Sequence, residues 1–432
     1  MATNDPASSE LRFDAAIAQL RDADFRRLFA ARLVSPFGSQ LTLVAMAFGV
    51  LGLTGEEGDV GVVLFAFTAS YAVTTVLGGA LADRWDRRRL IVAAEAFAGV
   101  VQTASAALLL TGRAHVWQLA LLMAANGAAF GIVAPAVVGL IPLVVERRRL
   151  QSANALLSVA HSSALLAGGA AAGWIVAFAG GGSNVTGAGA AIALDAASFF
   201  ATAALVARIR PRVAQRPVGA PDARDGSMLR DLREGFGEFV AHRWLWTIVA
   251  QWTLVLTGYL AGMHVVGPIV AERRWGGPLA WGGVAAALGA GLLVGGLVAM
   301  RVAVRRPMLV GTCFVFAFAA PLAAMALDAP VAVVAAAAFA AGLGNELFAV
   351  LWYTALHTHV APDKLSRVSA WDSLGSVGLA PLGQLGAGFL VGAVGLGPTL
   401  GLAVALVVVP TALVLLVPEV RRLESAPPRE AG

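Results

Sequence analysis

The chain has 432 residues, of which 58% are hydrophobic and only 13% are charged, whereas soluble globular domains are roughly 45–50% apolar. Its formal net charge is +5, but the basic residues flank apolar runs, a pattern that indicates membrane orientation and argues against nucleic-acid binding. The single cysteine, Cys313, excludes an internal disulfide framework.

The first residues, through Arg32, mix acidic and basic side chains before any apolar run, which is not the pattern of a cleavable signal peptide. Apolar runs then recur at the length of about 20 residues that spans a bilayer. We expect helices, because backbone groups in a bilayer find no water and the runs lack the alternation of barrel strands. The predicted spans are 33–54, 60–82, 90–111, 116–145, 153–179, 186–207, 245–271, 279–300, 308–327, 330–356, 369–395 and 398–418.

The basic residues give these spans a direction. If both termini are cytoplasmic, every one of the 31 Lys and Arg residues lies toward the inner face except Arg113, Arg273 and Arg274. The first outer loop carries Glu56, Glu57 and Asp59 and no base. This asymmetry follows the positive-inside rule and supports an even number of spans, with both termini in the cytoplasm.

The two halves of the chain resemble each other. A shift of 217 places lays "GGALADRWDRRRL" over "GGLVAMRVAVRRP", and a shift of 215 lays "LQSANALLS" over "LSRVSAWDS". The alternative is chance matching in a sequence rich in Ala and Gly. We predict an all-α polytopic membrane protein of two six-helix bundles related by a pseudo-two-fold axis. Its parts are an N-terminal segment (1–24), a first bundle (25–208), a linker with an amphipathic helix (209–243), a second bundle (244–419) and a cytoplasmic tail (420–432).

The stretch "GGALADRWDRRR" resembles the signature of the major facilitator superfamily between its second and third helices. Asp86 stands where that signature usually has a second Gly, as in the branch that holds macrolide-efflux and enterobactin-export proteins. "FRRLFAARLVSPFGSQLTLVA", "LQSANAL" and "APDKLSRVSAWDSLGSVGLAPLGQLGAG" are similar to the same branch, although "GGAAAGW" in span five lacks the usual Gly-Pro. The resemblance implies a monomer with a central cavity and alternating access.

The resemblance also implies a gate, in which the acid and base of the motif lock the inner side against span eleven. The alternative for the arginines is topogenic charge alone. The predicted gating residues are Gly79, Asp83, Arg84, Arg87, Arg88 and Asp372.

Ionisable residues within spans are costly and usually face a cavity or a partner. Glu346 is the first candidate for proton coupling, because the resemblance places span ten at the cavity; the alternative is an acid that holds helices together. Asp195 is favoured for a packing or hydrogen-bonding role, since span six is peripheral in the family. Glu95 and Arg32 are further candidates, which we expect to pair across helices.

Amides and amphipathic aromatic residues suit a large, partly apolar ligand, and they equally suit ordinary helix packing. The candidates for the substrate cavity are Gln40, Asn126, Gln251, Tyr259, His264, Asn345, Trp352 and Tyr353.

Enzyme signatures are absent from the sequence, and we predict no metal site, no cofactor and no nucleic-acid partner. There is no GxxxxGK[ST] phosphate loop, and His357 and His359 point apart on a helix. The sequence predicts a secondary transporter in a bacterial inner membrane that exports a drug-like or siderophore-like molecule in exchange for protons. The alternatives are a metabolite importer or facilitator of the same fold, and a membrane sensor that transports nothing.

Overall fold

The computed structural model describes residues 19–146, 149–210, 236–299, 301, 304–360 and 364–424, and the regular elements in these ranges are all helices. Twelve helical segments of this described part are long and apolar enough to cross a membrane. This confirms the predicted number of spans and the all-helical fold class.

The chain order of the helices follows the predicted spans, with three spans built from more than one element. The elements are η1 (Gln19–Arg21), α2 (Ala23–Thr54), α3 (Glu57–Arg84), α4 (Arg87–Leu110), α5 (Val116–Val144), α6 (Leu150–Phe178), α7 (Asn184–Ala207), α9 (Arg243–Leu260), η3 (Ala261–Val266), α10 (Gly267–Arg274), α11 (Pro278–Ala299), α12 (Pro307–Val315), η4 (Phe316–Phe318), α13 (Ala319–Ala326), α14 (Val331–His359), α15 (Leu365–Val377), α16 (Ala380–Val394), α17 (Leu396–Val414) and α18 (Pro418–Arg422). Most of the predicted linker helix lies outside the described residues; 236–241, at its end, are helical.

Side-chain caps fix where several helices begin. Asp22 caps α2 by accepting hydrogen bonds from the backbone N–H groups of Asp24 (2.9 Å) and Phe25 (3.0 Å). Asp86 caps α4 in the same way, through the backbone N–H of Arg89 at 2.8 Å. An acid at this position satisfies an otherwise unpaired N–H and favours the positive end of the helix dipole. Asp86 therefore has a local structural role in the charged loop between α3 and α4.

Span eleven differs from the single helix predicted over 369–395. α15 ends at Val377 and α16 begins at Ala380, with Pro381 in the first turn of α16. Proline has no N–H to continue the ladder and disfavours a helical residue before it. The Thr253 hydroxyl donates to the Gly375 carbonyl at 2.6 Å, so that a group near the break gains a partner from α9.

Span seven is also irregular. A π-helical segment, η3, joins α9 to α10, and Pro268 stands in the first turn of α10. A proline leaves carbonyls of the preceding turn without their usual partner, and π-helical turns commonly absorb such an interruption. The extra residue rotates the side chains on either side of η3 relative to a regular helix.

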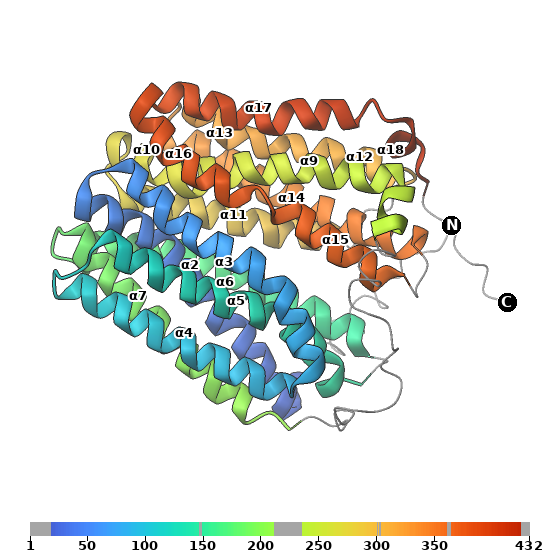
Figure 1. Cartoon of the computed structure of the whole chain (residues 1–432), viewed down its shortest axis with the longest axis horizontal. Coiled ribbons are helices and arrows are strands. Elements are labelled where there is room, and N and C mark those ends of the chain that lie inside the picture. Colours follow the sequence, from blue (N-terminus) through green and yellow to red (C-terminus); the bar gives the residue numbers. More distant parts are fainter. Residues whose placement is uncertain are drawn as a thin grey trace.

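The helices form two bundles, α2–α7 and α9–α17, which lie side by side in Figure 1. We call the end where α3 ends and α4 and α9 begin the basic end, and the end that carries Gly55 and Trp275 the opposite end. Figure 1 shows the bundles closest at the opposite end, near α10, and diverging toward the basic end, near α15. α6 packs on α11 and α3 packs on α16 across the bundle interface.

Glycines allow these two cross-bundle contacts. A Cβ on Gly282 of α11 would lie 2.7 Å from the Cα of Gly173 on α6, and one on Gly61 of α3 would lie 2.7 Å from the carbonyl oxygen of Gln384 on α16. Backbone atoms cannot move aside as a flexible side chain can, so these positions admit no side chain in this conformation. Small residues that let helix backbones approach are typical of membrane helix interfaces.

Candidate functional site

A cavity of about 250 Å³ lies between the two bundles. It is bordered by α3 from the first bundle and by α9, α14 and α15 from the second. The lining residues are Tyr71, Ala72, Thr75, Ile248, Val249, Trp252, Asn345, Phe348, Ala349, Trp352, Tyr353, Asp372, Leu374, Ser376 and Val377. The two bundles thus share one cavity, the place where a transporter of this architecture would hold a ligand.

Stacked aromatic rings form the wall of the cavity on the side of the second bundle. Trp252 of α9 stacks on Phe348 of α14, with ring centroids 4.8 Å apart and planes inclined by 18°. Phe348 in turn lies parallel to Trp352, at 6.2 Å and 16°. Trp244 meets the Trp352 ring edge-on at 5.7 Å. These contacts hold the rings rigidly, so the wall is a preformed apolar surface.

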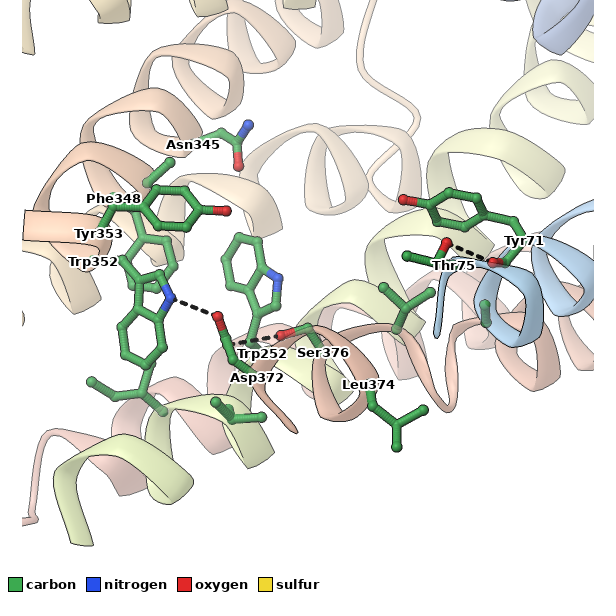
Figure 2. Close-up of a pocket in the computed structure, with 15 residues that line it drawn as sticks. Tyr71, Thr75, Trp252, Asn345, Phe348, Trp352, Tyr353, Asp372, Leu374 and Ser376 are labelled. Atoms are coloured by element: carbon green, nitrogen blue, oxygen red, sulfur yellow. Dashed lines mark hydrogen bonds between the residues drawn. The ribbon is translucent and has the colours of Figure 1, made fainter. Parts of the chain in front are cut away.

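The polar groups of the cavity are few. The indole N–H of Trp352 donates to Asp372 Oδ2 at 3.2 Å, and the Ser376 hydroxyl donates to Asp372 Oδ1 at 3.4 Å. Asp372 is 9% exposed. Figure 2 shows the hydroxyl groups of Tyr71 and Tyr353 pointing toward one another from opposite sides of the cavity. The cavity therefore combines a broad aromatic wall with one carboxylate and a small number of hydroxyl and amide groups.

Three of the eight residues predicted for the substrate cavity line it: Asn345, Trp352 and Tyr353. The other five do not line this cavity. The Gln251 amide donates to the Thr411 hydroxyl at 3.0 Å within the second bundle, and the Tyr259 ring packs against Phe318. His264 Nδ1 lies 3.4 Å from the Gln384 amide; Asn126 is buried; Gln40 lies close to Gly168.

The lining residues that sequence reasoning missed include Tyr71, Trp252 and Phe348. Their signal is helical spacing: Phe348 and Trp352 are four residues apart, as are Ile248 and Trp252, so each pair shares one face of its helix. A choice of cavity residues by polarity alone misses this pattern.

Part of the predicted gating motif lies outside the described residues. The structure does not describe the surroundings of Gly79 or the side chains of Asp83 and Arg84. The Arg87 guanidinium donates to the Gly139 carbonyl at 2.9 Å, and the Arg88 guanidinium donates to the Ile209 carbonyl at 3.0 Å. These hydrogen bonds place Arg87 and Arg88 against carbonyls of their own bundle. Asp372, the predicted partner on span eleven, faces the cavity.

Asp195 lies in a buried polar cluster inside the first bundle, away from the cavity. Its carboxylate accepts hydrogen bonds from the Thr42 hydroxyl at 2.6 Å, the Gln102 amide at 2.8 Å and the Ser198 hydroxyl at 3.1 Å. Gln102 also donates to Thr42 at 2.7 Å. The cluster joins α2, α4 and α7, as its members come from all three helices.

Glu95 and Arg32 lie near this cluster. Glu95 is buried and its carboxylate accepts a long hydrogen bond from Ser35, at 3.4 Å. Arg32 and Asp195 both interact electrostatically with Glu95. The structure thus brings three of the four proton-coupling candidates into one region of the first bundle.

The fourth candidate, Glu346, lies apart from them in the second bundle. It is half-buried on α14, with its Oε1 3.9 Å from the position of a Cβ on Gly296 of α11. It interacts electrostatically with Tyr353, which lines the cavity. Glu346 therefore stands beside the cavity wall, although it is not among the lining residues.

Charged and polar side chains tie the bundles together at the opposite end. Arg273 of α10 forms an ion pair with Glu57 of α3, and the Asn184 amide of α7 donates to both carboxylate oxygens of Glu272 at 3.2 Å. The charge pattern of the sequence contains a signal for these contacts: Arg273 is an exception to the positive-inside distribution, and Glu57 belongs to the acidic loop that the sequence predicts to be outside. We call these four residues the outer clasp.

Exchanging the two charges of the ion pair tests the outer clasp. We expect Glu57→Arg and Arg273→Glu each to raise the labelling rate of a cysteine placed at Leu385, which is half-buried where α16 packs against Gly61 of α3, because like charges then face each other. The double variant restores the pair and should return the labelling toward the wild-type rate. Labelling is measured in a Cys313→Ser background. Equal labelling of the singles and the double would show that the pair contributes nothing, the common result for exposed pairs.

Comparisons with known proteins bear on the whole chain. Residues 28–371 match the family described as Major Facilitator Superfamily. A stretch of 136 residues is 31% identical to an uncharacterised MFS-type transporter of Mycobacterium bovis and, equally, to one of Mycobacterium tuberculosis. That match covers 31% of this chain and only 31% of the length of either relative.

Solved structures with a similar fold cover nearly the whole chain. A variant of the nucleoside transporter NupG superposes with a TM-score of 0.70 at 12% identity, covering 91% of this chain and 99% of that one. A bacterial homologue of the human lysosomal transporter Spinster, inward-facing and unoccupied, gives a TM-score of 0.68 at 15% identity, covering 92% and 98%. Identities this low show a common fold and say nothing of the ligand.

Proposed function

This chain belongs to the Major Facilitator Superfamily, and we propose that it exports a small, moderately hydrophobic molecule by proton antiport with alternating access. As a member of this family it is a multi-pass membrane protein and a secondary transporter of a small molecule, not an enzyme. The direction of transport, the coupling to protons and the class of substrate are the proposed parts.

The aromatic wall is the single observation that carries the substrate class. Trp252, Phe348 and Trp352 present a continuous apolar surface to the cavity, and only a few polar groups accompany them. A site of this kind gains most of its affinity from apolar contact and takes its orientation from the few polar groups. A strongly hydrophilic solute such as a sugar would leave this wall without matching hydrogen bonds.

The membrane orientation supports export. We place the basic end and both termini in the cytoplasm of a bacterial cell, because Arg113, Arg273 and Arg274 are the only basic residues on the other side. In that orientation the outer clasp closes the outer side, and the bundles diverge toward the cytoplasm, from which an exporter takes its substrate. The sequence similarity to macrolide-efflux and enterobactin-export proteins agrees with this direction.

Proton coupling rests on the buried acids. Three acids lie within membrane spans: Glu346 beside the cavity, and Glu95 and Asp195 in the first bundle, where Arg32 lies near Glu95. A charge within a span is costly unless it is neutralised. Protonation is one way to neutralise an acid, which makes these residues the candidates for coupling. The proposed gate between Asp83 and span eleven would then link the protonation of these acids to the opening and closing of the basic end.

Flux measurements test the proposal. In an efflux-deficient bacterium, expression should lower the accumulation of one or more compounds from a panel of drugs and siderophores, and a protonophore should abolish the effect. In proteoliposomes, an imposed pH gradient should drive the flux of the same compound. Flux that ignores the gradient would refute antiport and leave a facilitator. Normal pH dependence in Glu346→Gln would remove Glu346 from the candidates.

A further inference from the structure

Among the described side chains, none places a positive charge beside the carboxylate of Asp372. Both of its hydrogen-bond donors, the Trp352 indole and the Ser376 hydroxyl, are neutral. In the described part of the chain, no Arg, Lys or His side chain forms an ion pair or a hydrogen bond with it. A buried carboxylate with no cation beside it is costly, and the cost falls when a positive charge enters the site.

The described groups packed around Asp372 are aromatic or neutral. α14 contributes Trp352 and Tyr353, α9 contributes Trp252, and α3 contributes Tyr71 across the cavity. The titratable groups in electrostatic contact here are Tyr353, which interacts with Asp372, and Tyr71 and Glu346, which interact with Tyr353. None of these groups carries a positive charge, so among the described residues the carboxylate has no cationic partner; a ligand or a proton can neutralise it.

Aromatic rings beside a carboxylate favour one ligand chemistry. The face of an indole attracts a cation through its quadrupole, and Trp is the strongest ring in this respect. Trp252 and Trp352 line the same cavity as Asp372, and Trp352 also holds the carboxylate by its N–H (Figure 2). An anion would meet Asp372 with repulsion, and a neutral apolar molecule would leave its charge buried and unbalanced.

We propose that Asp372, with the rings of Trp252 and Trp352, forms a binding site for an organic cation: a quaternary or protonated amine attached to an apolar body. That this ligand is also the transported substrate rests on the proposed export function. A proton neutralises the same carboxylate, so a proton and the cation exclude each other from Asp372. Binding of the cation would therefore displace a proton from Asp372 directly, with no other residue needed to couple the two.

Calorimetric titration of the purified full-length protein in detergent tests the site. The probe is benzyltrimethylammonium, whose charge is permanent, so any pH effect on its affinity comes from the protein. We expect saturable binding near pH 8, at least tenfold weaker in Asp372→Asn. The uncharged carbon isostere, neopentylbenzene, should bind wild type no better than Asp372→Asn, because it cannot balance the carboxylate. The control Glu419→Gln removes one negative charge from an exposed pair with Arg243 and should bind the probe like wild type.

A second measurement needs no variant, in case Asp372→Asn fails to fold. Lowering the pH from about 8 to about 5, across the range where a carboxyl in such a site takes up a proton, should weaken benzyltrimethylammonium binding to wild type at least tenfold. No saturable binding by wild type, equal binding by Asp372→Asn, or an affinity independent of pH would each overturn the proposal. Because no gradient is present, a failure of proton-driven flux in proteoliposomes would leave a positive result here intact.

Discussion

Gly282→Leu will abolish transport, whereas Gly283→Leu, the same substitution one residue later on α11, will leave it largely unchanged. A Cβ on Gly282 would lie 2.7 Å from the Cα of Gly173 and 3.0 Å from the carbonyl oxygen of Gly169, while a Cβ on Gly283 meets nothing within 4 Å. α6 and α11 would have to separate to admit the leucine at 282. The two bundles could then no longer close at the opposite end, and the transporter could not complete its alternating-access cycle.

The two variants are compared by flux per folded protein in proteoliposomes and by labelling of a single cysteine at Leu385, half-buried at the α3–α16 contact between the bundles, in a Cys313→Ser background. We expect at least a tenfold loss of flux and faster labelling for Gly282→Leu, because the outer clasp cannot form when the helices are apart. The two leucines add the same apolar volume, so effects of hydrophobicity on expression or insertion cancel. Equal flux in both variants would mean that α6 and α11 do not need this close approach.

The span count and the two-bundle fold were predictable because the bilayer acts on single segments. A run of about 20 apolar residues spans a membrane whatever its neighbours are, and twelve such segments are present. The break at Gly378 in span eleven was not predicted, since the sequence predicts one continuous span over 369–395. Its cause is local: Pro381 interrupts the ladder, and Thr253, more than a hundred residues away, provides a partner for the Gly375 carbonyl.

The cavity residues were harder to predict, and the neighbours Gln251 and Trp252 show why. Polarity favoured Gln251 for the cavity, yet Trp252 lines it and Gln251 bonds to Thr411 inside the second bundle. In a soluble protein the polar face of a helix meets water, so polarity tells the faces apart. In a membrane, the lipid face and the packed face are both apolar, and a polar residue often marks a helix contact.

The outer clasp illustrates a further limit of prediction from the sequence. Glu57 and Arg273 are 216 positions apart, and each by itself reads as an ordinary loop charge. Only the three-dimensional arrangement of the bundles shows that Arg273, one of the exceptions to the positive-inside pattern, meets Glu57 of the loop between α2 and α3. Where a charge breaks a strong compositional rule, a specific partner is a reasonable expectation to test.

Asp195→Ala will lower the free energy of unfolding by about 2 kcal/mol. The substitution leaves the donors of Thr42, Gln102 and Ser198 without their acceptor. The bonds from Thr42 and Gln102 join α7 to other helices, and interhelical hydrogen bonds in membrane proteins average about 0.6 kcal/mol each. A cavity adds to the loss. Gly38 of α2 makes room for the carboxylate, because a Cβ there would lie 2.3 Å from Asp195 Oδ1. The acid is therefore fitted between helices rather than merely buried.

Reversible unfolding in mixed detergent measures this loss, with Ser105→Ala as the control. Ser105 is buried on the same helix as Gln102, but among the described residues its hydroxyl bonds only to the Val101 carbonyl of its own helix, so we expect a loss of less than about 0.5 kcal/mol. Combining Asp195→Ala with Gln102→Leu should cost less than the sum of the single changes, because the two residues share one hydrogen bond.

Flux through the folded fraction of Asp195→Asn then separates the two roles of the acid. The new amide can donate to Gln102 Oε1, which has no hydrogen-bond partner in the described structure, so the helix contact can survive while the titratable proton is lost. Flux that keeps its normal dependence on the pH gradient would assign Asp195 to packing, as its peripheral span predicts. Folded protein whose flux no longer responds to the gradient would instead place proton coupling in the first bundle, away from the cavity.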